Sequence, residues 1–211
     1  MDNREFDTAL IDSAFSLAAE DGWSAVSVVA AARAAGLPLD RARRRFPCRG
    51  AVLCRFVSLV DQAALETELS GGTERERLFE LLMRRIDFLQ RRRTGVLAVM
   101  RALPAHPAAA AALAASSLGS MGWMLEAAGI SARGLRGRIR KRGLLGVWLW
   151  TLRAWRHDES EDLSSVMATL DQALTRAGQI AGWFGGRHEA GGDASVPEMP
   201  DEPTPEASPG G

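Results

Sequence analysis

Apolar residues recur at helical spacing along nearly the whole chain, and no stretch alternates apolar and polar residues as a strand would. The pattern predicts a first helix over about 4–20, with Leu10, Ala14 and Phe15 on its apolar stripe and Gly22 as its terminator. We therefore expect an all-α fold.

Two shorter helices are predicted after the first. Ser27 is placed to cap the second helix, which ends near Ala35, and Gly36 supplies the following turn. Pro38 is tolerated near the start of the third helix, because the first amides of a helix lack partners within it. Pro47 closes that helix. Three compact helices are thus expected at the N-terminus.

Longer helices follow, interrupted by a Ser-Gly-Gly-Thr break at 70–73. The C-terminal segment is rich in glycine, proline and acids, and it cannot bury enough apolar surface to fold alone. The predicted organisation is a head over 1–47, a linking helix and helical body over 48–184, and a disordered acidic tail over 185–211. The further helices are predicted to about residue 69, then over 74–93, to just before Pro104, and over 107–128, 132–157 and 161–184.

Charge is unevenly distributed, although the net charge is zero. Residues 185–211 carry six acids against one base, a net of −5, so residues 1–184 carry +5. Seven arginines and one acid, Asp40, lie between Arg33 and Arg55. Such asymmetry favours an anionic partner.

Several function classes lack their sequence signals. No N-terminal stretch has the order of a signal peptide, and no apolar run reaches the roughly 18 residues that span a membrane. Cys48 and Cys54 have no histidine nearby and suggest neither a zinc site nor a disulfide framework. No nucleophile elbow or phosphate loop is present. We expect a cytoplasmic protein with no cofactor, no metal and no enzymatic activity.

The N-terminal region resembles the helix-turn-helix head of TetR-family transcriptional regulators. Ser27, Gly36, Phe46 and Pro47 match the family pattern, and Arg49 stands where the family has a lysine. The resemblance implies a ligand-responsive repressor that binds double-stranded DNA as a homodimer, paired through its last two helices. It also implies that Ser27 and Arg49 contact phosphates.

The predicted third helix carries the candidate base-reading residues. Ala42 and Phe46 are four apart and should face the core, which leaves the neighbouring arginines outside. Arginine suits both bidentate contact to guanine and contact to phosphate. A solvated charge cluster on a head that no longer reads DNA is the alternative. The arginine candidates are Arg41, Arg43, Arg44 and Arg45.

Large apolar side chains in the body are candidates for an effector pocket. The plainer interpretation is that they belong to the core or a subunit interface. A basic cluster over 133–142 indicates an anionic ligand, or else a solvated helix start paired with the acids at 158–162. The expected effector is therefore small and apolar or anionic. The candidate pocket residues are His106, Met121, Trp123, Met124, Trp148 and Trp155.

A second resemblance offers a different function on the same fold. The segments 21–24 and 42–47, and Trp155 followed by the acids at 158–162, are similar to accessory proteins of ubiquinone biosynthesis. That family implies binding of an isoprenoid lipid or membrane and of a partner enzyme, without DNA. Its Trp-Tyr pair is missing here, since the chain has no tyrosine.

Overall fold

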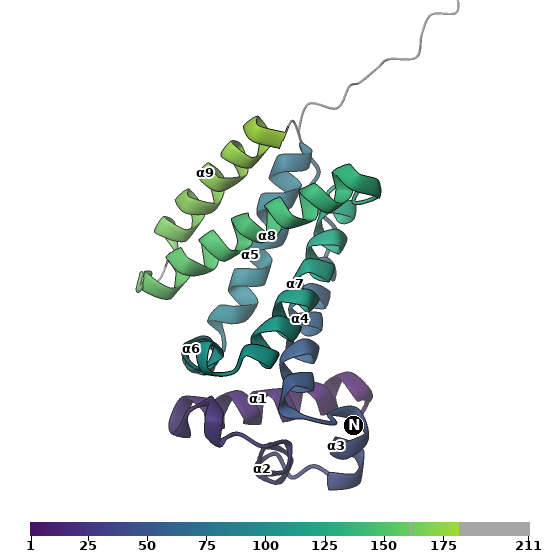
Figure 1. The fold of residues 1–211 in the computed structure, drawn as a ribbon, viewed down its shortest axis with the longest axis vertical. Helices are drawn as coiled ribbons and strands as arrows, with labels where there is room; N and C mark the ends of the chain where they lie inside the picture. Colours follow the sequence, from purple (N-terminus) through teal and green to yellow (C-terminus); the bar gives the residue numbers. More distant parts are fainter. Residues whose placement is uncertain (161, 182–211) are drawn as a thin grey trace, which may run out of the picture.

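The computed structural model describes residues 1–160 and 162–181, which fold as helices joined by short loops (Figure 1). No strand occurs among these residues, and the predicted all-α class is confirmed. The predicted tail, 185–211, lies outside the described residues. The helices are α1 (Asn3–Asp21), α2 (Val28–Ala34), α3 (Leu39–Arg45), α4 (Arg49–Leu65), α5 (Glu74–Gln90), α6 (Arg93–Ala102), α7 (Pro107–Ala127), α8 (Gly134–His157) and α9 (Ser164–Ala181), with 3₁₀ turns η1 (Trp23–Ala25) and η2 (Leu103–Ala105).

Helices α1, α2 and α3 form a compact head at one end of the molecule (Figure 1). The predicted stripe of α1 is buried, with Leu10 and Ala14 fully inside. The Ser27 hydroxyl accepts the amide N–H of Ala30 at 3.0 Å, which confirms the predicted cap of α2. Gly36 has φ of +64°, a conformation that favours glycine, and so turns the chain from α2 into α3.

Helix α4 runs from the head into the body and packs along α7 (Figure 1). It ends at Leu65, earlier than the predicted residue 69. Arg84 of α5 explains the difference, because its guanidinium donates to the carbonyl oxygens of Thr67 at 2.6 Å and Glu68 at 3.0 Å. These bonds hold the chain beyond Leu65 in a non-helical path. The break at 70–73 then leads into α5, which Thr73 begins with a capping box.

Helix α6 joins the body to the head, because it packs against α1 (Figure 1). A glycine allows the close approach, since a Cβ added at Gly95 would lie 2.5 Å from the carbonyl oxygen of Phe15. An ion pair between Arg92 and Asp12 joins the same two regions. The body therefore contacts the head through α6 as well as through α4.

Helix α7 corrects one sequence expectation, because by length and composition alone it is apolar enough to cross a membrane. Its alanines give it this character, while Met121, Met124 and Leu125 are buried in the helical body. Only part of α7 is buried, and a single helix of this length and composition is weak evidence for a membrane span.

Helices α8 and α9 form an antiparallel pair at the far side of the body (Figure 1). Asp158 fixes the turn between them, accepting from the hydroxyl of Ser165 at 2.5 Å, the amide of Val166 at 3.2 Å and the amide of Ser160 at 2.9 Å. Hydrogen bonds from Ser160 and Ser165 lower the pKa of the Asp158 carboxyl to about 2. One interpretation of the basic cluster over 133–142 paired it with the acids at 158–162, of which residue 161 lies outside the described residues. Instead Asp158 caps the turn, at the opposite end of α8 from that cluster.

Candidate functional site

The surface of α3 carries two exposed arginines. Ala42 and Phe46 are buried, which confirms the predicted inner face of the helix. Arg44 is largely exposed and forms an ion pair with Asp40 one turn earlier, at 2.8 Å. Arg43 is exposed and donates to the carbonyl oxygen of Pro47 at 2.7 Å. Both side chains lie at the surface of the head.

Arg45 does not point outward as expected. Its Nε and Nη2 donate to the two carboxylate oxygens of Asp7 at 2.5 and 2.7 Å, and Asp7 is fully buried in α1. Arg55 of α4 donates to the same carboxylate at 2.6 Å. Burial alone would raise the pKa of Asp7, but the hydrogen bonds from the two arginines hold it below its usual value. Arg45 thus joins α3 to α1, with Arg55 on the same acid.

Arg41 is also turned back onto the head. Its guanidinium donates to the carbonyl oxygen of Asp2 at 3.0 Å and to the side chain of Asn3 at 2.9 Å. It lies 4.4 Å above the ring of Phe6, a distance at which a cation is attracted to an aromatic face. Arg41 therefore holds the start of α1 against α3, contrary to the expected outward position.

A shallow groove of about 310 Å³ lies between α2, α3 and the start of α4. Ser27, Arg43 and Arg49 all line it, although they come from three different helix ends. Val29 and Leu39 line the same groove, and both are exposed. Three of the six predicted DNA-contact residues are thus brought together beside the exposed Arg44, and Arg41 and Arg45 are held elsewhere.

Arg49 and His106 meet at the junction of head and body. Arg49 donates to the carbonyl oxygen of Ser24 at 3.2 Å and approaches Nδ1 of His106 at 3.4 Å. The other ring nitrogen of His106 lies 3.2 Å from the hydroxyl of Ser24. An arginine can only donate, so Nδ1 accepts and Nε2 carries the proton toward Ser24. His106 therefore links η2 to η1 and α4.

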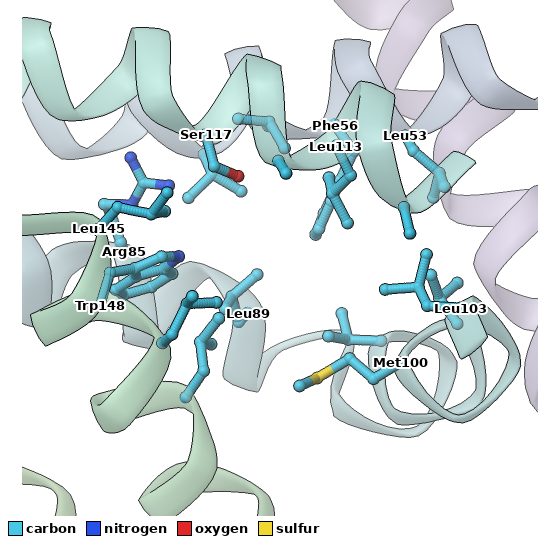
Figure 2. Close-up of a pocket in the computed structure, with 18 of the residues that line it drawn as sticks. Leu53, Phe56, Arg85, Leu89, Met100, Leu103, Leu113, Ser117, Leu145 and Trp148 are labelled. Atoms are coloured by element: carbon cyan, nitrogen blue, oxygen red, sulfur yellow. The ribbon is translucent and has the colours of Figure 1, made fainter. Parts of the chain in front are cut away.

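An apolar cavity of about 240 Å³ occupies the body, between α4, α5, α6, α7 and α8 (Figure 2). It reaches from Trp148 and Leu145 at one end to Leu53 and Leu103 near the head (Figure 2). Nearly all of its lining is aliphatic or aromatic, which favours an apolar occupant.

Arg85 is the charged residue in the lining of this cavity (Figure 2). It is buried, its Nη1 bonds the carboxylate of Asp61, and its guanidinium lies 4.6 Å from the Trp148 ring. Burial lowers the pKa of Arg85 and raises that of Asp61, while each charge opposes the shift of the other. Among the described residues, the Nε–H of Arg85 has no hydrogen-bond partner.

Comparison with known proteins rests on structure. No protein-family model and no curated protein sequence matches this chain. A TetR transcriptional regulator from Nitrosomonas europaea has a TM-score of 0.66 and 24% identity over 82% of this chain and 98% of that chain. A TetR transcriptional regulator from Rhodococcus has a TM-score of 0.58, with 17% identity, over 83% and 97% of the two chains. A TetR-family regulator from Streptomyces coelicolor has a TM-score of 0.54, with 19% identity, over 86% and 83%.

This chain has a TetR-like fold. The comparisons give no support to the resemblance with ubiquinone-biosynthesis accessory proteins.

Most of the predicted pocket residues lie outside the lining of the cavity in the TetR-like body. Trp148 lines the cavity, as expected. Trp155 is buried and donates to the side chain of Gln90 at 2.8 Å, while Trp123 is exposed. The remaining three predicted pocket residues also lie outside the cavity lining. Met121 and Met124 are buried residues of α7, and His106 lies at the junction with the head.

The sequence pattern was not used to identify Arg85 and Asp7, although the position of each in its helix indicates a buried charged residue. Arg85 occupies an apolar stripe that includes Leu82 and Leu89 of α5. Asp7 likewise precedes Leu10 at the spacing of the buried stripe in α1. A charged residue at a core position of an amphipathic helix is rarely unpaired, which makes such positions candidates for buried pairs.

Proposed function

We propose that this protein is a DNA-binding transcriptional regulator, a ligand-responsive repressor that acts as a homodimer. The groove that collects Ser27, Arg43 and Arg49 beside Arg44 carries the proposal, because it places cations on the outer face of a helix-turn-helix head. Side chains and helix ends of this kind hold phosphates and so position a head on a duplex.

The groove also offers apolar contacts. Val29 and Leu39 are 47% and 41% exposed, so their side chains are free to meet the methyl group of thymine in a major groove. Two heads of a homodimer would then enter successive major grooves about 34–36 Å apart, on a near-palindromic site.

The body supports the proposed homodimer and the proposed response to a ligand. Leu135, Ile139 and Trp150 are exposed and share the outward face of α8, as expected for a helix that pairs with a second copy. An effector in the cavity would touch α4 and α6, the two body helices that contact the head. The coupling between effector and DNA must then be reciprocal.

The direct test is selection of the purified protein against a pool of random DNA duplexes at fixed physiological salt. Enrichment of a two-fold symmetric motif supports the proposal, and a folded protein that enriches no sequence refutes it. Salt is held constant because arginine–phosphate attraction weakens steeply as salt rises.

A pair of double variants locates the contact surface. Arg43→Ala with Arg44→Ala should weaken binding of the selected duplex at least about tenfold, since one good base contact alone discriminates by about 1–3 kcal/mol. Arg91→Ala with Arg101→Ala removes two exposed arginines of the body, one just beyond α5 and one in α6, and should leave the affinity unchanged. Equal losses in the two double variants would argue against recognition through α3.

A further inference from the structure

The basic cluster over 133–142 covers the start of α8 and the residue before it. Four of its six cations are exposed. Among residues 1–160 and 162–181, no acid forms an ion pair with any of the six. Arg138 and Arg142 lie one helical turn apart, so their like charges repel unless an anion lies beside them. The six cations are Arg133, Arg136, Arg138, Arg140, Lys141 and Arg142.

The cluster lies at the end of the molecule remote from the head. The start of α8 and the end of α7 are both at that end, whereas α1, α2 and α3 form the other (Figure 1). A duplex bound across the head would therefore lie at the opposite end of the molecule from the cluster. The anion that the cluster favours must come from another source.

A shallow groove of about 410 Å³ lies beside the cluster, between α7 and the start of α8. Arg133 and Lys141 line it together with Trp123, which is 68% exposed. The one acid of the lining, Glu126, accepts the amide N–H of Ala132 at 2.8 Å. The groove thus offers an exposed aromatic ring beside two cations.

The acidic tail over 185–211 matches this surface in charge and in composition. Its net charge of −5 balances the +5 of residues 1–184. Its prolines at 197, 200 and 203 recur at the three-residue repeat of polyproline II, and proline-rich segments of this kind dock in grooves lined by aromatic side chains. Four of its six acids lie among or just after these prolines, namely Glu198, Asp201, Glu202 and Glu206.

The end of α9 brings the tail close to the cluster. Helices α8 and α9 are antiparallel, and the 18 residues of α9 rise about 27 Å, so Ala181 returns to about the level of residue 140 in α8. From Ala181 to Glu198 the chain can span up to about 55 Å, which is more than the length of α8, about 36 Å. The acids of the tail can therefore reach every cation of the cluster.

We propose that residues 196–206 of the chain's own acidic tail bind the groove beside Trp123 and the basic cluster over 133–142. One exposed ion pair contributes little, but several charges in a network contribute more, and a tethered segment meets its site at an effective concentration in the millimolar range. The contact would cover the cluster and so confine attraction of nucleic acid to the head. This inference goes beyond the proposed function and does not depend on it.

Lys141 gives the contact a chemical reporter, because it is the only lysine of the chain. A carbodiimide joins a lysine amine directly to a carboxylate in contact with it, and peptide mass spectrometry identifies the pair. In the full chain at low salt, we expect Lys141 to be joined to acids at 198–206. Raising the ionic strength to 1 M shortens the screening length to about 3 Å and should reduce the yield several-fold. Cross-links to Glu126 alone, or to no acid, would overturn the proposal.

Variants assign the cross-link to the cluster and the groove. Arg136→Ala with Arg138→Ala removes two exposed cations and should lower the yield about threefold or more, the effect expected of two exposed ion pairs. Trp123→Ala should also lower it, because the ring that meets the prolines is lost. Arg91→Ala with Arg101→Ala removes exposed cations outside the cluster and is the control, with helicity checked by circular dichroism. Equal yields in the two double variants would refute the role of the cluster.

Isotope labelling separates the chain's own tail from that of a second copy. Labelled and unlabelled chains are mixed equally and incubated until subunits exchange, before the carbodiimide is added. Cross-linked pairs in which both peptides are labelled, or both unlabelled, support the chain's own tail. Pairs of one labelled and one unlabelled peptide would show that a second copy supplies the tail, and would overturn the proposal.

Discussion

At the scale of single residues, buried acids decide which arginines of the head reach the surface. Asp7 is fully buried and accepts from Arg45 and Arg55, which would otherwise add to the charge on the head. Two partners on one carboxylate satisfy it well, and both guanidinium groups keep some contact with solvent. The arrangement therefore stabilises the head and reduces the positive charge that the head presents to solvent.

Asp7→Asn should destabilise the protein by about 1.5–3 kcal/mol at pH 7, the range for hydrogen bonds to charged groups. Because the pKa of Asp7 is lowered on folding, its contribution is complete above the ordinary carboxyl pKa of about 4 and disappears as the pH falls through the folded value. Urea unfolding at pH 7 and at successively lower pH should show the difference between the two proteins shrinking. Asp87→Asn, at an exposed position on α5, is the control, and an equal effect at both sites would contradict the role of Asp7.

Asp158 makes a similar prediction for the α8–α9 turn. Its folded pKa of about 2 means that its stabilising bonds persist above the ordinary carboxyl pKa of about 4 and are lost as the pH falls toward 2. Asp158→Asn should therefore unfold at lower urea than the original chain at pH 7, and the two midpoints should converge near pH 2. Midpoints that differ equally at both pH values would show that charge at Asp158 is not responsible.

At the scale of helices, the contact of α6 with α1 depends on the absence of a side chain at Gly95. Gly95→Ala would place a methyl group 2.5 Å from a backbone oxygen of α1, which has little freedom to move. We expect a loss of about 1–3 kcal/mol, as for other overpacked sites, measured by thermal unfolding.

Gly119→Ala is the matched control for that experiment. Gly119 is also in a helix, and among the described residues nothing outside its own helix backbone and chain neighbours lies within 4 Å of a Cβ added there. Alanine there should raise stability by about 0.5–1 kcal/mol, because glycine in a helix loses more conformational freedom on folding. A similar loss of stability at Gly95 and Gly119 would contradict the role of the α1 contact, because only Gly95 lies against α1.

The helices themselves were predictable, whereas the roles of most arginines were not. The cap at Ser27 and the inner face at Ala42 and Phe46 follow from neighbouring residues, so the sequence pattern was sufficient. The end of α4 and the direction of Arg45 depend on Arg84 and Asp7, which lie far away along the chain. Local pattern cannot identify such partners, and the same reason explains why the cavity retained only Trp148 of its six predicted residues.

At the scale of the whole molecule, the outward face of α8 predicts association. Replacing exposed Trp150 by Glu should convert the proposed homodimer to monomers, because a charge at a closely packed apolar interface is poorly tolerated. Sedimentation velocity measures the result directly. Gln62→Glu introduces a charge at an exposed position of α4 and should leave the mass unchanged, while a dimer that survives Trp150→Glu would place the interface elsewhere.

The hydrogen bonds that hold Arg41 and Arg45 against the head reduce the number of counterions that DNA binding should release. A protein that neutralises phosphates releases condensed counterions, so the slope of log affinity against log salt counts its phosphate contacts. Arg43, Arg44 and Arg49 in each of two heads give about six contacts and a slope near −5, whereas all five predicted arginines would give about ten and a slope near −9. Fluorescence anisotropy of a bound duplex across salt concentrations measures this slope. A value near −9 would mean that Arg41 and Arg45 leave the head on binding, and a value near −5 that the head stays intact and its affinity falls less steeply as salt rises.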